Sequence, residues 1–340
     1  MIRSKGTKRG AGFSKPRTPT VVQVGSPHHK GGKGTANITP PRNVIYFSNG
    51  TYPLTDIVSQ PYTDVIIGFM YPDDNFNLQG SGGAFNDNLQ SNIRALKQAG
   101  KNVLISLGGS NTELLSSAYQ YYTQNRSDLV TQIVNNFVIK YGFDGVDIDY
   151  EDDAGFTGTY DGIGFLNALT SALAQALPSG QNIITHAPQI PYWDSNYYNA
   201  PYAQIWQAVG NQITWLNNQF YNQPGYVEAA TDFVKWYRNV AAVTGPEKSL
   251  VGAILDPSTK DGYITLPNMT NNVIIPLKAA FPQFGGAMGW EFFLDKEDQG
   301  GIWGITIASA LTPALSSGSW STNDPTPATN AQTAAGKPSG

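Results

Sequence analysis

The chain has 340 residues, 40% of them hydrophobic and 14% charged, with a formal net charge of −4. This composition is typical of a globular protein, and no apolar run is long enough to cross a membrane as a helix. With no cysteine and three histidines, the sequence excludes disulfides, thiolate metal sites and cysteine nucleophiles, and we expect no metal and no cofactor.

The amino-terminal segment differs from the rest of the chain. Residues 1–42 contain nine of the 21 Lys and Arg residues and no acid, which leaves 12 bases against 25 acids in the remainder. We therefore expect a disordered basic tail over 1–42, a catalytic domain over 43–318 and a second disordered tail over 319–340. The basic tail is either a solvated linker or a binder of an anionic partner. It shows no conventional secretory signal peptide, because no apolar core follows its charges.

Between these tails, short apolar runs alternate with segments of helical spacing. Eight runs are predicted as buried strands: 43–48, 64–71, 102–109, 145–151, 182–188, 214–222, 249–255 and 285–293. Helices are predicted at 88–100, 127–142, 164–177 and 226–243, with Gly100, Gly142 and Gly245 at helix ends.

Eight strands with intervening helices favour an α/β fold in which a single domain forms an eight-stranded β/α (TIM) barrel. The alternative is a doubly wound open sheet. No Gly-x-Gly-x-x-Gly or P-loop pattern follows a predicted strand, so the usual signature of such a sheet is missing.

The stretch "FDGVDIDYED" (143–152) places Asp144, Asp147, Asp149 and Glu151 within eight residues of an otherwise apolar run. Side chains alternate along a strand, so Asp147, Asp149 and Glu151 share the face opposite Val146 and Ile148. In a barrel that face points into the lumen, and Glu151 lies nearest the carboxyl-end rim where barrel enzymes have their active sites.

Carboxylates this close in a poorly hydrated lumen cannot all ionise near neutral pH, so at least one pKa should rise. We expect Asp147 and Asp149 to share a proton and Glu151 to act as the general acid. Two other interpretations are a solvated acidic loop without a role and a Mg²⁺ or Ca²⁺ site.

The motif Asp144-Gly-Val-Asp-Ile-Asp-Tyr-Glu151 resembles the D-G-x-D-x-D-x-E signature of glycoside hydrolase family 18, the chitinases and their relatives. "LISLGGS" (104–110) is similar to the family's S-x-G-G motif. "HAPQIP" (186–191) and "NNQFYNQ" (217–223) resemble segments of plant class III, hevamine-like chitinases, and "GAMGWEF" (286–292) supplies the expected tryptophan. The resemblance spans about 43–315.

The resemblance implies retaining catalysis in which the substrate's own 2-acetamido oxygen is the nucleophile. It implies that Glu151 protonates the glycosidic oxygen and then activates water, that Asp149 orients the acetamido group, and that Asp147 partners Asp149. Tyr221 would hydrogen-bond the acetamido group and Trp290 would form the floor under the sugar. The remaining expected substrate-binding residues are Gln219, Asn222, Gln189, Phe69 and Tyr46. The residues expected to be structural within the motifs are Asp144, Gly145 and Ser106.

Three further side chains are candidates. Tyr192 and Trp193 follow a predicted strand end and are candidate sugar platforms. His186 is either a residue of the barrel core or a modulator of the site's pH profile.

The resemblance leaves three functions open. The first is a chitinase that cleaves β-1,4 bonds between N-acetylglucosamine units in a shallow, non-processive cleft. The alternatives are an endo-β-N-acetylglucosaminidase acting on N-glycan cores and a non-catalytic chitin-binding lectin or inhibitor. The expected partner is chitin or a chito-oligosaccharide, with no nucleic acid at the active site and no membrane span. We expect an extracellular monomer.

Overall fold

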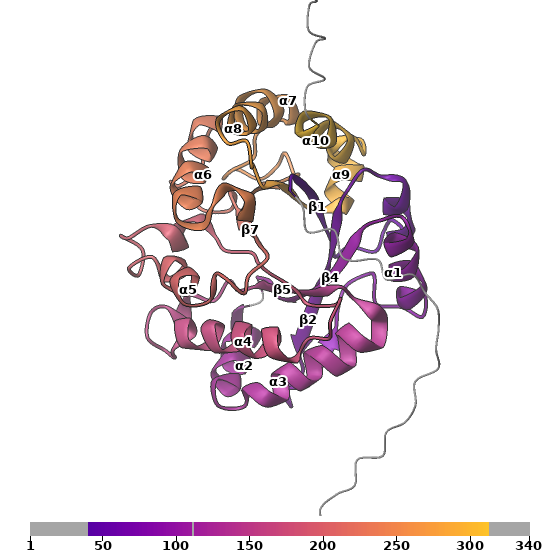
Figure 1. Cartoon of the computed structure of the whole chain (residues 1–340), viewed down its shortest axis with the longest axis vertical. Coiled ribbons are helices and arrows are strands. Elements are labelled where there is room, and N and C mark those ends of the chain that lie inside the picture. Colours follow the sequence, from indigo (N-terminus) through magenta and orange to yellow (C-terminus); the bar gives the residue numbers. More distant parts are fainter. Residues whose placement is uncertain (1–39, 111, 313–340) are drawn as a thin grey trace, which may run out of the picture. The chain divides into compact units, whose positions relative to one another are not determined.

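Eight parallel strands close into a barrel, with helices arranged around it as a ring (Figure 1). The computed structural model describes residues 40–110 and 112–312, so the predicted tail segments at 1–39 and 319–340 lie outside the described residues. The predicted β/α barrel is confirmed. Its strands are β1 (Arg42–Phe47), β2 (Asp64–Pro72), β4 (Asn102–Gly108), β5 (Gly145–Asp149), β6 (Ile183–His186), β7 (Trp215–Gln219), β8 (Ser249–Ile254) and β9 (Gly286–Trp290).

The strands follow one another around the barrel in chain order. The sheet runs β1-β9-β8-β7-β6-β5-β4-β2, and β1 pairs with β2 to close it. A ninth strand within the described residues, β3 (Leu78–Gly80), forms an antiparallel hairpin with β2, with Tyr71 opposite Gln79. β3 was not predicted, because a strand of three residues has too short a pattern to detect in the sequence.

Helices occupy most of the connections between strands. They are α1 (Leu89–Gln98), α2 (Thr112–Gln124), α3 (Arg126–Gln132), α4 (Gly162–Ala176), α5 (Pro201–Val209), α6 (Ala230–Thr244), α7 (Leu266–Asn268), α8 (Ile275–Ala280), α9 (Phe292–Asp298) and α10 (Trp303–Leu311). Two π-helical segments, Ile133–Gly142 and Met269–Ile274, continue α3 and join α7 to α8. Four 3-10 turns span Leu54–Ser59, Asp153–Gly155, Ile190–Trp193 and Pro246–Lys248.

Three of the predicted helices match the observed segments closely. The predictions at 88–100 and 164–177 correspond to α1 and α4, and that at 127–142 corresponds to α3 with its π-helical continuation. The prediction at 226–243 is displaced, because α6 begins only at Ala230. No helix in residues 40–110 and 112–312 is long and apolar enough to cross a membrane.

The alternation of side chains along the strands divides the core into two parts. Outward-facing residues such as Ile45, Val146 and Ile148 are buried in the large cluster between strands and helices. Inward-facing residues fill the lumen below the acidic residues as a second cluster, which includes Val44, Ile66, Leu104, Ile183, Trp215, Leu250 and Met288. The barrel is therefore packed at its amino end, and polar groups gather toward its carboxyl end.

Arg42 corrects the predicted boundary of the basic tail. It is the first residue of β1 and is only 2% exposed. Its guanidinium pairs with Asp64 at 2.9 Å and lies over the Trp215 ring at 3.8 Å. A charge count along the sequence placed Arg42 with the other bases of the tail, but the Asp64 carboxylate lets it be buried at the base of the barrel.

Candidate active site

The acidic motif lies on β5 as the alternation predicted. Asp147 and Asp149 are 0% and 3% exposed, and the register places Asp147 beside Ser106 of β4 and Thr185 of β6. β5 ends at Asp149, two residues earlier than expected, so Glu151 lies just beyond the strand and is partly exposed. The three acidic residues are therefore placed in order from the barrel interior to its rim.

Asp147 is held by hydrogen-bond donors from four different strands. Tyr46 Oη and Ser106 Oγ donate to Asp147 Oδ2 over 2.7 and 2.8 Å. Thr185 Oγ1 and Asn217 Nδ2 donate to Oδ1 over 2.5 and 3.2 Å. Burial raises the pKa of Asp147, and these four bonds oppose that rise because they stabilise the charged form. The carboxyl is thus fixed in position.

Asp149 and Glu151 form a pair of interacting carboxyls that share the Gln219 amide as a hydrogen-bond donor. Burial raises the pKa of Asp149 well above its usual range, and the neighbouring charges of Glu151 and Asp147 add to the rise. Burial also raises the pKa of Glu151. We expected Asp147 and Asp149 to share the proton, but the charge of Glu151 raises the pKa of Asp149 more than that of Asp147 does. The oxygens of Asp147 are already occupied by its four donors.

Two glutamine amides orient this pair. Gln219 Nε2 donates to Asp149 Oδ1 over 2.8 Å and lies 3.3 Å from Glu151 Oε1. Gln189 Nε2 donates to Glu151 Oε2 over 3.2 Å. Both glutamines were predicted to bind substrate, and this stays a prediction. In the structure they contact the acidic pair, where their hydrogen bonds favour the ionised carboxylates and oppose the rise of the pKa values.

The glycines of the Ser-x-Gly-Gly segment allow a close approach to β5. A side chain on Gly108 would lie 2.0 Å from the carbonyl oxygen of Asp149, and Gly108 has a φ of +116°. The next amide, that of Gly109, donates to the same carbonyl over 2.8 Å. Any larger residue at 108 would displace the backbone that carries Asp149.

Aromatic side chains surround the acidic pair. Tyr221, just after β7, is 5% exposed, and its pKa is raised well above the usual range by burial and then by the charges of Asp149, Glu151 and Asp147. The half-buried Trp290 ring lies 5.4 Å from that of Tyr46 and 5.7 Å from that of Phe69. The predicted Tyr221, Trp290, Phe69 and Tyr46 therefore belong to one cluster.

Asn222 and Asp144 do not join the acidic pair. Asn222 is exposed and in the left-handed conformation (φ +60°), and its backbone amide donates to the carbonyl of Asp261. Asp144 precedes β5 at the amino end of the strand, where it pairs with Lys97 at 2.8 Å and accepts from the Val103 amide. A side chain on Gly145 would collide with the Ile183 carbonyl oxygen at 1.9 Å, so Gly145 is required for strand packing.

His186, Tyr192 and Trp193 belong to the core. His186 faces the helices, with Nε2 3.1 Å from Thr170 Oγ1 of α4 and Nδ1 3.3 Å from Tyr202 Oη of α5. Tyr192 and Trp193 are 0% and 9% exposed, which contradicts a role as open sugar platforms.

Sequence reasoning missed Tyr71, Thr185, Asn217 and Glu291. Tyr71 is half-buried, and burial with the charges of Asp149 and Glu151 raises its pKa to about 12. The alternation of side chains along strands could have indicated three of them. Tyr71 lies on the same face of its strand as Phe69, and Asn217 on the same face as Gln219. Thr185 lies opposite Asp147 on the neighbouring strand. Glu291 accepts bonds from the Ser48 amide and hydroxyl, each at 2.7 Å, a pairing between the ends of β1 and β9 that no local pattern indicates.

This arrangement can deliver and recover a proton. The raised pKa values of Asp149 and Glu151 favour retention of a proton by the pair, and the partly exposed Glu151 is the member that can reach a group at the rim. Among residues 40–110 and 112–312, no group of three or more His, Cys, Asp or Glu residues is arranged to hold a metal ion.

Comparison with known proteins gives consistent matches. The family described as glycosyl hydrolases family 18 matches residues 42–272. A solved family 18 chitinase from Pseudoalteromonas aurantia is 35% identical, with a TM-score of 0.74, over 80% of this chain and 100% of its own.

The curated relatives match over shorter stretches. Chitinase 1 of Tulipa saxatilis subsp. bakeri is 26% identical over 175 residues, which are 49% of this chain and 52% of the relative. Chitinase D of Niallia circulans is 30% identical over 149 residues, which are 40% of this chain and 28% of the relative. The matched part of the chain thus spans about half of the first relative and less of the second.

Proposed function

The chain belongs to glycosyl hydrolases family 18, and from this premise we propose that it is a chitinase that hydrolyses β-1,4 bonds between N-acetylglucosamine units. The observation that carries the proposal is the carboxyl pair of buried Asp149 and partly exposed Glu151 at the carboxyl-end rim, with Tyr221 near the pair and Trp290 packed against Tyr46. The 35% identity to a family 18 chitinase over that protein's whole length supports the same substrate class.

In the proposed reaction the acetamido oxygen of the substrate attacks the anomeric carbon as the glycosidic C–O bond breaks. Glu151 gives its proton to the departing oxygen, and the sugar remains as a cyclic oxazolinium ion. Asp149, ionised at that moment, accepts a hydrogen bond from the acetamido N–H and stabilises the positive charge. Glu151 then removes a proton from water, which attacks the anomeric carbon and opens the ring with net retention.

A single proton kept by the pair is enough for these steps, because only the leaving oxygen has to be protonated. The raised pKa values of Asp149 and Glu151 support a proton kept by the pair in the free site. When the acetamido N–H becomes the hydrogen-bond partner of Asp149, the proton remains with Glu151, where the leaving group requires it. Asp147, fixed by its four donors, keeps a negative charge near Asp149 that favours the positively charged intermediate.

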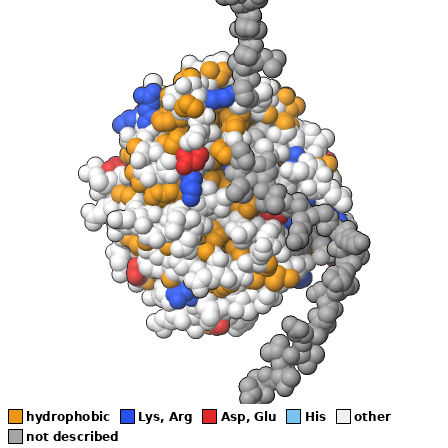
Figure 2. Space-filling model, viewed as in Figure 1, with side chains coloured by type: hydrophobic (Ala, Val, Ile, Leu, Met, Phe, Trp, Pro, Cys, Tyr) orange, Lys and Arg blue, Asp and Glu red, His pale blue; other side chains and the backbone are white. Residues whose placement is uncertain are grey.

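The surface of the domain is also compatible with an uncharged polymer as substrate. Figure 2 shows charged side chains scattered over one face of the barrel rather than gathered in a patch, in keeping with a chain that is only 14% charged. Because chitin is deposited outside cells, we propose that the protein acts extracellularly, as a monomer in which one barrel supplies the whole site.

The proposal is tested by incubating the protein and its Glu151→Gln variant with N-acetylglucosamine oligomers and, separately, with a high-mannose glycopeptide. Oligomer cleavage that falls at least about a thousandfold in the variant supports a chitinase that uses Glu151. Cleavage of the glycopeptide alone would make the protein an endo-β-N-acetylglucosaminidase. Binding of oligomers without cleavage by the wild type would make it a lectin.

A further inference from the structure

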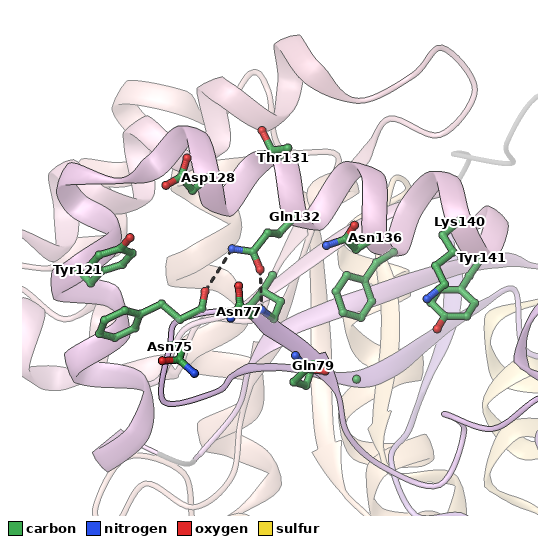
Figure 3. A pocket seen from close by; sticks show the side chains of 14 residues that line it. Asn75, Asn77, Gln79, Tyr121, Asp128, Thr131, Gln132, Asn136, Lys140 and Tyr141 are labelled. Carbon is green, nitrogen blue, oxygen red and sulfur yellow. Dashed lines mark hydrogen bonds between the residues drawn. The ribbon is translucent and has the colours of Figure 1, made fainter. Parts of the chain in front are cut away.

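A groove of about 600 Å³ lies on the outside of the barrel, between the β2–β3 hairpin and the helical segment that runs from α3 to Gly142 (Figure 3). None of its lining residues belongs to the acidic cluster. The groove is nevertheless linked to the aromatic residues of that site, because Gln79 in its wall pairs with Tyr71 of β2, and the Tyr71 ring lies 5.8 Å from that of Phe69.

Two rows of polar side chains face each other across the groove (Figure 3). The hairpin contributes Asn75, Asn77 and Gln79 at every second position, and all three are exposed. The helical row repeats at every fourth position and consists of Asp128, Gln132, Asn136 and Lys140. The hairpin row runs from the turn into β3, and the helical row runs from α3 into the π-helical segment.

Aromatic rings lie among these amides. The Phe76 ring stacks on Tyr121 with a centroid distance of 4.1 Å and an interplanar angle of 9°, and Tyr141 lines the groove beside Lys140. Phe76, Tyr121 and Tyr141 are all partly exposed. Phe76 has a φ of +60°, a left-handed conformation that is strained for an aromatic residue and is retained mostly where function requires it.

The walls are held rigidly before any ligand binds. Gln132 joins them, because its Nε2 donates to the Phe76 carbonyl over 3.2 Å and its Oε1 accepts from the Leu78 amide over 2.7 Å. Asp73 Oδ1 accepts from the Asn75 and Asn77 amides over 2.9 and 2.8 Å and so fixes the turn. The opposite wall includes the π-helical segment Ile133–Gly142, a rare conformation that recurs at functional sites.

We propose that this groove is a second saccharide-binding site, which holds a chain of N-acetylated sugar units one strand away from the catalytic rim. The substrate class rests on the proposed function. Asn and Gln amides can donate to and accept from hydroxyl and acetamido groups, and the exposed ring faces can pack against the C–H faces of sugars. Of the described side chains that line the groove, only Asp128 and Lys140 are charged, so the site fits a neutral ligand.

Other ligand classes fit this lining less well. An apolar ligand would bury the amides without hydrogen-bond partners, which is costly. An anion would meet a single cation, Lys140, opposed by Asp128 within the same groove.

The test removes one exposed amide from each wall. Gln79→Ala/Asn136→Ala is compared with Gln120→Ala/Asn135→Ala, which removes the same two amide types from exposed positions on α2 and the π-helical segment outside the groove. Each pair is placed in the Glu151→Gln chain, and N-acetylglucosamine tetramer is titrated while backbone amide signals are followed by NMR.

The inference predicts that the tetramer shifts the amide signals of residues 75–79 and 136. The groove variant should lose about tenfold in affinity at those signals, equal to about 1.4 kcal/mol, while the control pair matches the parent. Signals at 75–79 that stay unchanged while those near Asp149 shift would overturn the groove site and leave the proposed function intact. Shifts at 75–79 would support the groove site whether or not the wild type cleaves the tetramer. A failure of the groove proposal can therefore be told apart from a failure of the proposed chitinase function.

Discussion

Tyr46 of β1 donates a hydrogen bond of 2.7 Å to Asp147 of β5, across the lumen of the barrel. Both residues are fully buried, and the pKa of Tyr46 is raised well above its usual range by burial and then by the charges of Asp147 and Asp149. The phenol therefore stays protonated and serves as a permanent donor. This contact links the first strand to the motif on which the proposed chemistry depends.

Replacing Tyr46 with Phe should lower stability and activity together. Hydrogen bonds to charged groups contribute about 1.5–3 kcal/mol. Because the lost donor favoured ionised Asp147, the stability deficit should be larger at pH 8 than at pH 5, as measured by urea unfolding. Tyr62→Phe is the matched control, since Tyr62 donates over 2.7 Å to buried Asp295 outside the acidic cluster. The control should lose similar stability without loss of kcat, and equal losses of kcat in both variants would contradict the role of Tyr46.

Asp149→Asn should abolish hydrolysis and stabilise the fold at neutral and higher pH. The folded pKa of Asp149 is raised, so its contribution to stability is complete below its unfolded pKa and is lost as pH rises through the folded pKa. An amide resembles the protonated carboxyl, can still accept from Gln219 and does not titrate. Each pKa unit is worth about 1.4 kcal/mol, so the gain in Tm should be several degrees at pH 8 and small at pH 4. A Tm difference independent of pH would count against a raised pKa.

Trp290→Ala should weaken substrate binding more than it slows chemistry. The ring packs on Tyr46 and Phe69 and leaves part of its surface open. Removing this floor should raise KM for N-acetylglucosamine oligomers about tenfold, equivalent to about 1.4 kcal/mol, with a smaller change in kcat. Trp236→Ala removes a partly buried tryptophan on α6 as a control and should leave KM unchanged. A change confined to kcat would argue against a sugar-binding floor.

His186→Gln should make the fold more resistant to acid. Burial lowers the pKa of His186 to about 3, so the folded state keeps the ring neutral while the unfolded chain takes up a proton below about 6.5. The stability of the wild type linked to this group is complete above about 6.5 and is lost as pH falls toward 3. Relative to the variant, the wild type should lose about 1.4 kcal/mol per pH unit in that window. A stability difference that is constant from pH 7 to pH 4 would contradict the assignment.

Much of the fold and of the acidic cluster could be predicted, because both depend on local periodicity. Alternation along 145–151 indicated that Asp147 and Asp149 face the lumen, and apolar runs located the eight barrel strands. The proton partner of Asp149 could not be predicted, since it depends on donors from β1, β4, β6 and β7 that converge on Asp147 only after the barrel closes. Arg42 was misassigned for the same reason, because its partner Asp64 lies 22 residues away.

The groove beside the β2–β3 hairpin could not be predicted either, because it also depends on contacts between segments that are distant in the sequence. Asn75, Asn77 and Gln79 form an unremarkable polar stretch in the sequence, and they acquire a partner surface only when α3 and its π-helical continuation pack against the hairpin. The left-handed conformation of Phe76 has no signal in the sequence, because such conformations favour Gly or Asn.

The most direct test of the central claim is the configuration of the first product released from an N-acetylglucosamine pentamer, followed by proton NMR at early times. If Asp149 and Glu151 assist attack by the substrate's own acetamido group, the new reducing end appears as the β anomer and only later equilibrates with the α anomer. An α anomer formed first would mean direct attack by water and would contradict the assigned roles of the pair.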